Sequence, residues 1–387
     1  MTGPADDLAD WLRLACVPGL GAQGQRALLA AFGLPGHIFA AGRGALAAVV
    51  GGTTADALLS PPPHEKIERT LAWAGEAGNH ILTLADADYP RRLFDIPDPP
   101  PLLYVKGEPA LLSRPGIALV GARSATAAGE ANAEAFARAL AQQGLVVISG
   151  LALGIDAAAH RGALAAGGAS AGTVAVIGTG IDRIYPARNA ALAREIAASG
   201  AVVSEFPLGT PPLQHNFPRR NRLIAGLAEG VLVVEAALGS GSLITARLAT
   251  ETGREVFAIP GSIHSPLSRG CHRLIRDGAK LVETAEDVFE ELRGRLGWST
   301  PVVTPVKSSG RRGAEPATPA EPPLQAALAL DGETARVLEA IGHDPVDLDT
   351  IAARCGLTVD ALYAILLPLE LEGRLAQLPG GRFQRIT

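Results

Sequence analysis

The sequence is poor in cysteine, in aromatic residues and in basic charge. Its three cysteines, Cys16, Cys271 and Cys355, lie far apart and form no CxxC pair, so they predict neither a disulfide framework nor a zinc site. Aromatic residues make up 4% of the 387 residues while alanine and glycine abound, which favours close-packed helices and tight turns. The net charge is −5, so binding to nucleic acid would need a local basic patch.

Long apolar runs and a signal sequence are also lacking. The longest apolar runs are of strand length, too short to span a bilayer. Asp6, Asp7 and Asp10 stand where a signal peptide would carry basic residues ahead of an apolar run. We therefore expect a cytoplasmic protein with no membrane partner. The chain is long enough for two or three domains.

The N-terminal part is predicted to be helical from Leu8 to about Val50, with breaks at glycines. Within it, Val17-Pro-Gly-Leu-Gly21 followed by Gln25–Leu29 has the form of a helix–hairpin–helix turn, whose glycine amides can approach a DNA phosphate. Small helical domains also use such turns only for packing, and we favour that interpretation. We assign residues 1–78 to a small helical domain of the SAM or helix–hairpin–helix type.

Apolar strands alternate with helices in the central part of the chain. Unbroken Val, Ile and Leu runs of this kind are typical of a parallel sheet covered on both faces. We predict a Rossmann-like, doubly wound α/β domain with a mainly parallel sheet at residues 79–297. Strands are expected at 117–120, 145–149, 173–177, 201–205, 231–235 and 255–259, with a weaker one at 279–282. Two earlier strands, at 80–84 and 102–106, could extend the same sheet.

Ligands bind doubly wound sheets outside the carboxyl ends of the strands, and glycine and polar residues follow every strong strand here. The first strand breaks at Gly121, presents Arg123, Ser124 and Thr126, and enters an alanine-rich helix. Unpaired amides at a helix start favour an anion, and Arg123 adds a forked donor suited to phosphate. Taken alone, the segment fits a tight turn with a solvated arginine equally well.

A second basic segment runs from Phe217 to Arg222. Arg219 and Arg222 are three residues apart at the predicted start of a helix, so they share a face. Phe217 lies just before them, and an aromatic ring beside arginines suits single-stranded nucleic acid. The alternative is a core phenylalanine with surface or ion-paired arginines. Further cationic candidates after the strands are Arg183, Arg188 and Arg220.

Enzymatic interpretations find less support. The GxGxxG and GxxxxGK[ST] fingerprints are absent and no spacing suits a metal, so we expect no cofactor and no metal. Asp156 and His160 are four residues apart and could form an acid–base pair. We expect instead that Asp156 caps its helix after Gly154 and that His160 packs locally.

Carboxylates and serines at other strand ends leave the same alternatives open. Glu205 and Glu235 stand where catalytic carboxylates could lie, but they could equally bond to loop amides or arginines. Ser240 and Ser242 lie among glycines without a GxSxG elbow, which argues against a hydrolase nucleophile. We expect no catalytic residue.

Taken together, the loops resemble those of the bacterial DNA-processing protein A (DprA/Smf) family. The resemblance extends from about Tyr89 to Val288. Its motifs occur in the expected order: Tyr89-Pro90, Leu103–Gly107, Gly121-Ala-Arg-Ser-Ala-Thr126, Ser149–Asp156 with His160, Tyr185-Pro-Ala-Arg-Asn189, Ser204-Glu205, Phe217–Gly226 and Ser240–Ala246.

The resemblance implies a protein that binds single-stranded DNA without enzymatic turnover. Members of this family protect incoming strands during natural transformation, load the recombinase RecA and form homodimers through the Rossmann-like domain. At the matching positions the expected DNA contacts are Gly121 with Arg123, and the segment containing Phe217, Arg219, Asn221 and Arg222. Members often have lysine where Arg219 stands, which keeps the charge but alters the donor geometry. To these we add Ser124, Thr126 and Arg183 from the strand-end loops.

One enzymatic alternative stays open. A nucleotide phosphoribohydrolase of the lysine-decarboxylase-like family has a related Rossmann-like core, with a PGGxGTxxE motif after a strand. The corresponding place here holds Gly239-Ser-Gly-Ser-Leu-Ile-Thr245, without the downstream glutamate at that spacing.

The C-terminal part begins with residues 298–330, rich in Pro, Ala, Ser and Thr, which predict a flexible linker. Beyond it, helices are expected at 333–341, 348–355 and 359–372, with a hairpin wing at 374–384. This pattern predicts a winged-helix domain at 331–387. The helix at 359–372 has no Lys or Arg, so we predict a protein-interaction or regulatory module. A transcription regulator that binds duplex DNA through this domain is the alternative.

Overall fold

The computed structural model describes residues 4–167, 170–296, 333–334, 336–338, 340–341 and 345–386. The chain divides into two compact units, one of residues 1–125 and 132–292 and the other of residues 126–131 and 293–387. Each is described by itself. The linker predicted at 298–330 lies outside the described residues, and the predicted division into domains at residues 78, 297 and 330 stays a prediction.

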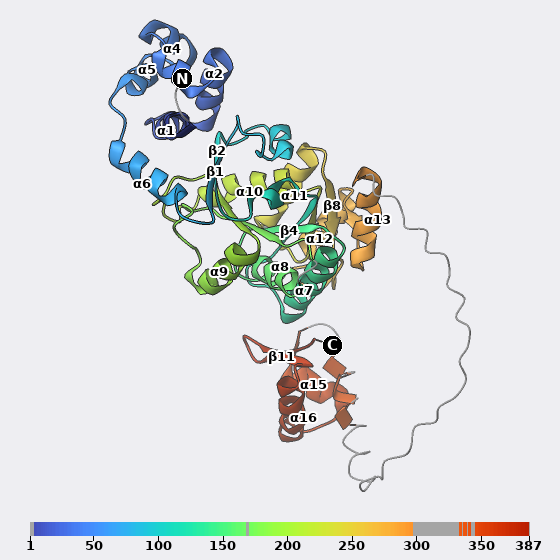
Figure 1. The fold of residues 1–387 in the computed structure, drawn as a ribbon. Helices are drawn as coiled ribbons and strands as arrows, with labels where there is room; N and C mark the ends of the chain where they lie inside the picture. Colours follow the sequence, from blue (N-terminus) through green and yellow to red (C-terminus); the bar gives the residue numbers. More distant parts are fainter. Residues whose placement is uncertain are drawn as a thin grey trace, which may run out of the picture. The chain divides into compact units, whose positions relative to one another are not determined.

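The first segment of the larger unit is helical, as predicted (Figure 1). Its helices pack apolar side chains, mostly leucine, into a core of their own that includes Leu14, Leu28, Ile38, Leu46 and Leu58. Gly19, at φ 76°, makes the turn between the first two helices, because this left-handed conformation is one that other residues rarely adopt. The helices are α1 (Pro4–Ala15), α2 (Ala22–Phe32), α3 (Pro35–Ala40), α4 (Arg43–Val50), α5 (Gly52–Leu59) and α6 (His64–Ala74).

A nine-stranded sheet with the order β1-β2-β6-β5-β4-β3-β7-β8-β9 forms the centre of this unit. The seven strands from β3 onward are parallel, while β2 pairs antiparallel with both β1 and β6. The predicted extension of the sheet by two early strands is therefore confirmed. The strands are β1 (Asn79–Thr83), β2 (Leu102–Gly107), β3 (Gly116–Val120), β4 (Val146–Ser149), β5 (Thr173–Val176), β6 (Ala201–Ser204), β7 (Gly230–Val233), β8 (Glu255–Ala258) and β9 (Lys280–Leu281).

Helices cover both faces of this sheet, which explains why its strands are apolar without alternation. In β5, Val174 and Val176 enter the core on one face, whereas Ala175 and the following Ile177 enter the core on the other. The doubly wound, mainly parallel α/β fold is confirmed. The helices of the α/β fold are α7 (Ala127–Gln142), α8 (Ile155–Leu164), α9 (Ala190–Ser199), α10 (Asn216–Leu227), α11 (Ser242–Glu251), α12 (Arg269–Arg276) and α13 (Ala285–Leu296).

The direction of chain progress reverses at β3, which has β4 on one side and β7 on the other. At such a switch point the connections leave in opposite directions, and a crevice opens outside the carboxyl ends of the two strands. The segments after β3 and β7 are therefore the place to look for a site.

The C-terminal unit contains the predicted winged helix. Helix α15 (Leu348–Cys355) is capped by Asp347, whose carboxylate accepts from the Thr350 amide at 2.8 Å, and α16 (Val359–Leu371) is capped by Thr358. Strands β10 (Val346–Asp347), β12 (Arg382–Arg385) and β11 (Leu375–Leu378) form a small antiparallel sheet. The described residues of the helix predicted at 333–341 are helical.

Within the described residues, no helix by itself is both long and apolar enough to cross a membrane. Helices α15 and α16 meet that criterion only as a pair, across a bend of 107°.

Candidate nucleic-acid interface

A cleft of about 810 Å³ opens at the switch point. We call it the switch-point cleft. Three segments that are far apart in sequence form its walls: the loop after β3, the first turns of α10, and the β7–α11 loop. The lining residues used below are Gly121, Arg123, Ser124, Asp156, Tyr185, Phe217, Arg220, Asn221, Ser240 and Ser242.

The loop after β3 needs a glycine where the sequence has one. A β-carbon on Gly121 would lie 2.6 Å from Ile155 Cγ1 and 2.9 Å from the Glu235 carbonyl oxygen, so a larger residue does not fit. The chain passes close to β7 and α8 at this point and then presents Arg123 and Ser124, both exposed, to the cleft. Gly121, Arg123 and Ser124 all line the cleft.

Arg123 is the available cation of this cleft. Its guanidinium carbon lies 5.6 Å from the centre of the Phe217 ring. In the part of the chain that the structure describes, no carboxylate forms an ion pair with Arg123. An arginine held over an aromatic ring without a counter-ion can bind a phosphate with both its charge and its fork of donors.

Two aromatic rings form an adjoining surface. Phe217 is half-buried, and its ring centre lies 5.7 Å from that of Tyr185, with the ring planes tilted by 44°. A β-carbon on Gly178 would lie 2.9 Å from Phe217, so the glycine makes room for the ring. Tyr185, 49% exposed, was not among the predicted site residues. The signal that could have found it is its position in the loop after β5, on the same edge of the sheet as Phe217.

Arg220, two residues before Arg222, is a buried cation at the floor of the cleft. It donates to the Gly150 carbonyl at 2.6 Å and also to the Val176 carbonyl, and so ties the ends of β4 and β5 to α10. Burial lowers its pKa to about 10, which leaves it charged at neutral pH. Its role is to hold the floor together, and no ligand is needed to account for it.

Asp156 lies beside Arg220 and accepts from the amides of Gly150 at 3.1 Å and Ala152 at 3.3 Å. The prediction that Asp156 caps α8 is wrong: Gly154 is the N-cap, and the carboxylate bonds back to the loop before it. Burial raises the pKa of the Asp156 carboxyl, and the charge of Arg220 opposes that shift. The carboxylate is used to fix the β4–α8 loop.

His160 packs locally, as predicted. It is fully buried, and its Nδ1 lies 2.8 Å from the hydroxyl of Thr173, which itself donates to the Val147 carbonyl. Burial, and to a lesser degree the charge of Arg220, lowers the pKa of His160 to about 3. Asp156 and His160 therefore bond to different groups, and the geometry favours the packing interpretation over an acid–base pair.

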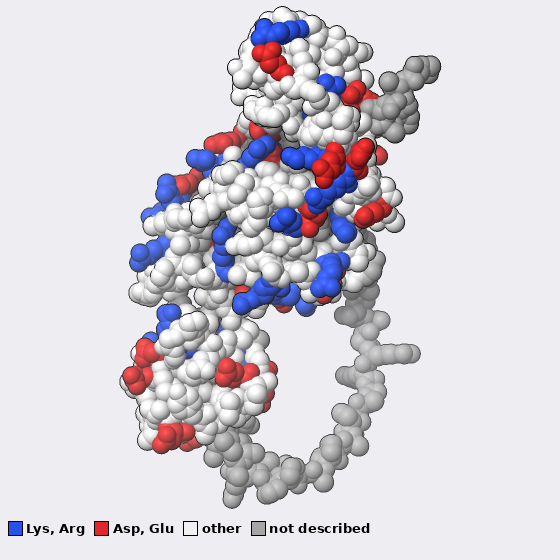
Figure 2. Space-filling view, turned by 90° about the vertical axis from the view of Figure 1, so that its left-hand side faces the viewer, with Lys and Arg blue, Asp and Glu red and all other residues white. Residues whose placement is uncertain are grey.

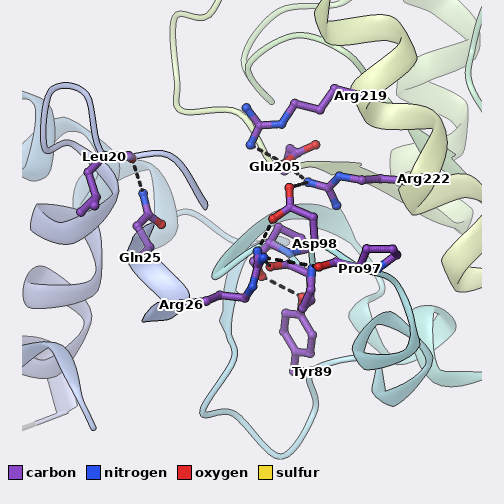
Figure 3. Close-up of polar contacts among 11 residues, drawn as sticks. Leu20, Gln25, Arg26, Tyr89, Pro97, Asp98, Glu205, Arg219 and Arg222 are labelled. Carbon is purple, nitrogen blue, oxygen red and sulfur yellow. Dashed lines mark hydrogen bonds and ion pairs between the residues drawn. The ribbon is translucent and has the colours of Figure 1, made fainter. Parts of the chain in front are cut away.

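Arg219 and Arg222 share a face of α10, as predicted, but that face is turned away from the switch-point cleft. Both converge on the buried carboxylate of Glu205, with Nη2 to Oε2 distances of 3.0 Å from Arg219 and 2.5 Å from Arg222 (Figure 3). Asp98 lies 3.7 Å from Arg222 and pairs with Arg26 of α2. We call these five residues the interhelix ion cluster.

The segment 217–222 therefore does not face the switch-point cleft as a whole. Residues 217, 220 and 221 line the cleft, whereas 219 and 222 belong to the interhelix ion cluster. Burial raises the pKa of Glu205, and Arg222 and Arg219 oppose the shift. Arg222 is 11% exposed and Arg219 44%, so Arg219 alone of the two keeps substantial contact with solvent.

The remaining predicted contacts lie at different places. Asn221 donates to the Gly241 carbonyl at 3.4 Å and so joins α10 to the β7–α11 loop, where the hydroxyls of Ser240 and Ser242 are 2.6 Å apart. Arg183 is exposed in the loop after β5 and does not line the cleft. Thr126 accepts from the Gly129 amide at 3.0 Å at the start of α7.

Positive charge is local and not global. On the face drawn in Figure 2, basic and acidic side chains are interspersed over the surface and do not form one continuous basic patch. This agrees with the net charge of −5, so binding to nucleic acid would depend on a local cation such as Arg123, which has no carboxylate partner in the described part of the chain.

Comparison with known protein families gives matches over both units. The family model for DNA recombination-mediator protein A matches residues 80–293, and the model for the DprA winged helix domain matches residues 315–381.

Relatives of known sequence agree with these models. Protein Smf of Escherichia coli is 42% identical over 320 residues, covering 82% of this chain and 81% of its own length. DNA processing protein DprA of Streptococcus pneumoniae is 49% identical over 210 residues, covering 54% of this chain and 73% of its own length.

Solved structures show the same relationship. The X-ray structure of DprA from Streptococcus pneumoniae matches with a TM-score of 0.65 and 38% identity, covering 75% of this chain and 99% of that one. The structure of DNA processing protein A from Helicobacter pylori, which is described as having a unique single-stranded DNA binding mode, matches with a TM-score of 0.50 and 31% identity. The match covers 56% of this chain and 96% of that one.

Proposed function

Because the chain belongs to the DNA recombination-mediator protein A (DprA/Smf) family, we propose that it binds single-stranded DNA in the switch-point cleft. The observation that carries the proposal is Arg123, which has no carboxylate partner among the described residues and lies 5.6 Å from the centre of the Phe217 ring. A backbone phosphate binds to Arg123, and the neighbouring base stacks on Phe217 with Tyr185 beside it. The Helicobacter pylori relative, whose description names single-stranded DNA binding, supports this choice of ligand.

The predicted contacts take different roles in this proposal. Gly121, Ser124 and Asn221 shape and line the cleft around Arg123 and Phe217. Arg219, which is 44% exposed, meets the phosphate backbone only where a strand leaves the cleft, and Arg222 positions Arg219 through their common partner Glu205. Thr126 and Arg183 are kept as candidate contacts outside the cleft lining.

We further propose that the protein acts in the cytoplasm as a homodimer that protects incoming strands during natural transformation and loads RecA onto them, without catalysis. Two exposed apolar side chains support an interface on the α/β unit: Leu238, 52% exposed, follows β7, and Ile263, 74% exposed, follows β8. Asp156 and Glu205 are both engaged by amides or arginines, which argues against their use as acid or base.

The test compares two phenylalanines. Anisotropy of a labelled oligothymidine, and of a duplex of the same length, is measured with the wild-type protein, Phe217→Ala and Phe94→Ala. Phe94 is 53% exposed and does not line the cleft, so it is the matched control. We expect a preference for the single strand and a loss of about tenfold in affinity for Phe217→Ala, because stacking contributes roughly 1–3 kcal/mol per base. Equal affinities of the two variants would overturn the site.

A parallel incubation with nucleoside monophosphates tests the phosphoribohydrolase alternative. We expect no release of free base. Release that is lost in Arg123→Ala would identify the cleft as an enzymatic site instead.

A further inference from the structure

Helix α16 of the winged helix is apolar on its outer side as well as on its inner side. Its inner side places Leu362, Ile365, Leu366 and Leu369 in the core. On its outer side, every fourth residue is large, apolar and exposed: Val359 by 41%, Tyr363 by 50%, Leu367 by 58% and Leu371 by 81%. We call these four the outer stripe. An amphipathic helix with one buried side has no internal reason to expose such residues at one-turn intervals.

The charges around the outer stripe are acidic. Helix α16 contains no Lys or Arg, and it carries Asp360 near its start and Glu370 near its end, with Glu372 directly after it. In sequence, residues 331–387 hold nine Asp and Glu against five Arg. A surface of this sign repels phosphate, so the helix position that reads duplex DNA in other winged helices is unsuited to DNA here.

The nearby arginines do not change that sign. Arg336 donates to the Cys355 carbonyl at 2.8 Å, and Arg354 donates to the Ala340 carbonyl at 2.9 Å. Arg374 lies 3.6 Å from Glu372. Each of these cations serves the fold or a neighbouring acid.

Pro368 leaves a backbone carbonyl beside the outer stripe without its usual donor in the helix. Pro368 lies inside α16 and has no N–H, so it cannot donate to the Ala364 carbonyl one turn earlier. Both residues are exposed, next to Leu367. An acceptor in the middle of an apolar stripe suits a donor from a bound partner.

We propose that the outer stripe is the docking surface for a basic amphipathic helix of a partner protein. The partner's apolar side packs on Tyr363, Leu367 and Leu371, and its Lys and Arg side chains at the edges meet Asp360, Glu370 and Glu372. A second copy of this chain fits less well. The stripe has acids at both ends, so two α16 helices set acid against acid in either orientation.

The test uses the full-length protein and two labelled helical peptides of 15 residues. One peptide has leucines at positions i, i+3, i+4 and i+7 with lysines elsewhere, and the other has glutamate in place of lysine. We expect the Leu/Lys peptide to bind at least tenfold more tightly than the Leu/Glu peptide, measured by anisotropy. We expect Leu367→Glu to weaken binding of the Leu/Lys peptide at least tenfold.

The choice of Leu367→Glu separates docking from simple attraction. The variant adds a negative charge, so purely electrostatic binding of a basic peptide would become tighter. Leu59→Glu, at a position 44% exposed in α5, is the control and should leave peptide binding unchanged. Thermal melting confirms that both variants fold, and the affinity for oligothymidine should be the same in both.

Four results would overturn the proposal. These are no binding of the Leu/Lys peptide, equal binding of the two peptides, a concentration-dependent dimer in sedimentation that Leu367→Glu abolishes, or duplex binding that the same substitution abolishes. The third result would identify a second copy of the chain as the occupant, and the fourth would identify DNA.

Discussion

Arginines in opposite electrostatic states lie on the two sides of α10. Toward the interhelix ion cluster, Arg219 and Arg222 share the carboxylate of Glu205, and Asp98 and Arg26 complete the group. Toward the switch-point cleft, Phe217 meets Arg123, which has no carboxylate partner among the described residues. Arginine content alone therefore does not point to the proposed DNA site. The proposal rests on Arg123, which lies beside an aromatic ring without a carboxylate partner among the described residues.

The largest effect is expected on the free energy of unfolding, from substitution of Arg220. Arg220→Met should lower the free energy of unfolding by about 3–5 kcal/mol, because it removes the donor of the buried Gly150 and Val176 carbonyls and the positive charge near the buried Asp156. Arg219→Met should cost less than about 1 kcal/mol, since Arg219 is 44% exposed. Urea denaturation measures both. Equal losses would show that the two adjacent arginines do not differ in role.

A second effect depends on pH and on His160 under the cleft floor. Its pKa of about 3 lies below the ordinary value of 6.5, so the unfolded chain binds the proton first as the pH falls. Stability is therefore fully present above pH 6.5 and is lost between pH 6.5 and 3, by about 2 kcal/mol at pH 5. Denaturation of the wild-type protein and of His160→Gln at pH 7 and 5 measures this. A wild-type loss no larger than that of the variant would contradict the assignment.

The third prediction concerns DNA binding alone. Arg123→Ala should weaken oligothymidine binding about tenfold, equal to about 1.4 kcal/mol, with no change in melting temperature, because the side chain is exposed and pairs with no carboxylate among the described residues. Arg247→Ala is the control, since Arg247 is 69% exposed and lies in α11 outside the cleft lining. If Arg123→Ala bound as tightly as this control, the cleft would not be the DNA site.

The smallest effect is expected on DNA affinity, from substitution of the ion-paired Arg219. Arg219→Ala should reduce affinity by less than about threefold, because its charge is shared with Glu205. The slope of log K against log salt should fall by about 0.7 in Arg123→Ala and by clearly less in Arg219→Ala. Equal changes in slope would place both arginines on the DNA backbone and remove the contrast between the two sides of α10.

Most of the fold follows from the sequence for a simple reason. Runs such as Ile117–Val120 and Thr173–Ile177 are apolar without alternation, which only a sheet covered on both faces explains. Asp347 and Thr358 stand one residue before the two winged-helix helices, where caps are expected.

The sequence predicts the edge of the sheet at which the candidate cleft lies, but it does not predict which side chains of α10 line that cleft. The strand-end rule brings Gly121 and Phe217 to one edge, and they do line one cleft. Spacing alone does not say which side of α10 faces that edge, because each residue turns the helix by about 100° and the phase is set by packing against the sheet. Arg219 and Arg220 are adjacent in sequence, yet one pairs with Glu205 and the other is buried under the cleft.

The position of β3 in the middle of the sheet sets an order of assembly during synthesis. Arg123 leaves the ribosome early, but its opposite wall consists of Phe217 and of Gly239–Ser242 on the far side of the switch point. A nascent chain that ends before β7 has Arg123 and Phe217 but lacks the cleft wall formed by Gly239–Ser242. DNA-binding ability should therefore arise in one step, once about two-thirds of the chain has been made, and no shorter N-terminal fragment should retain it.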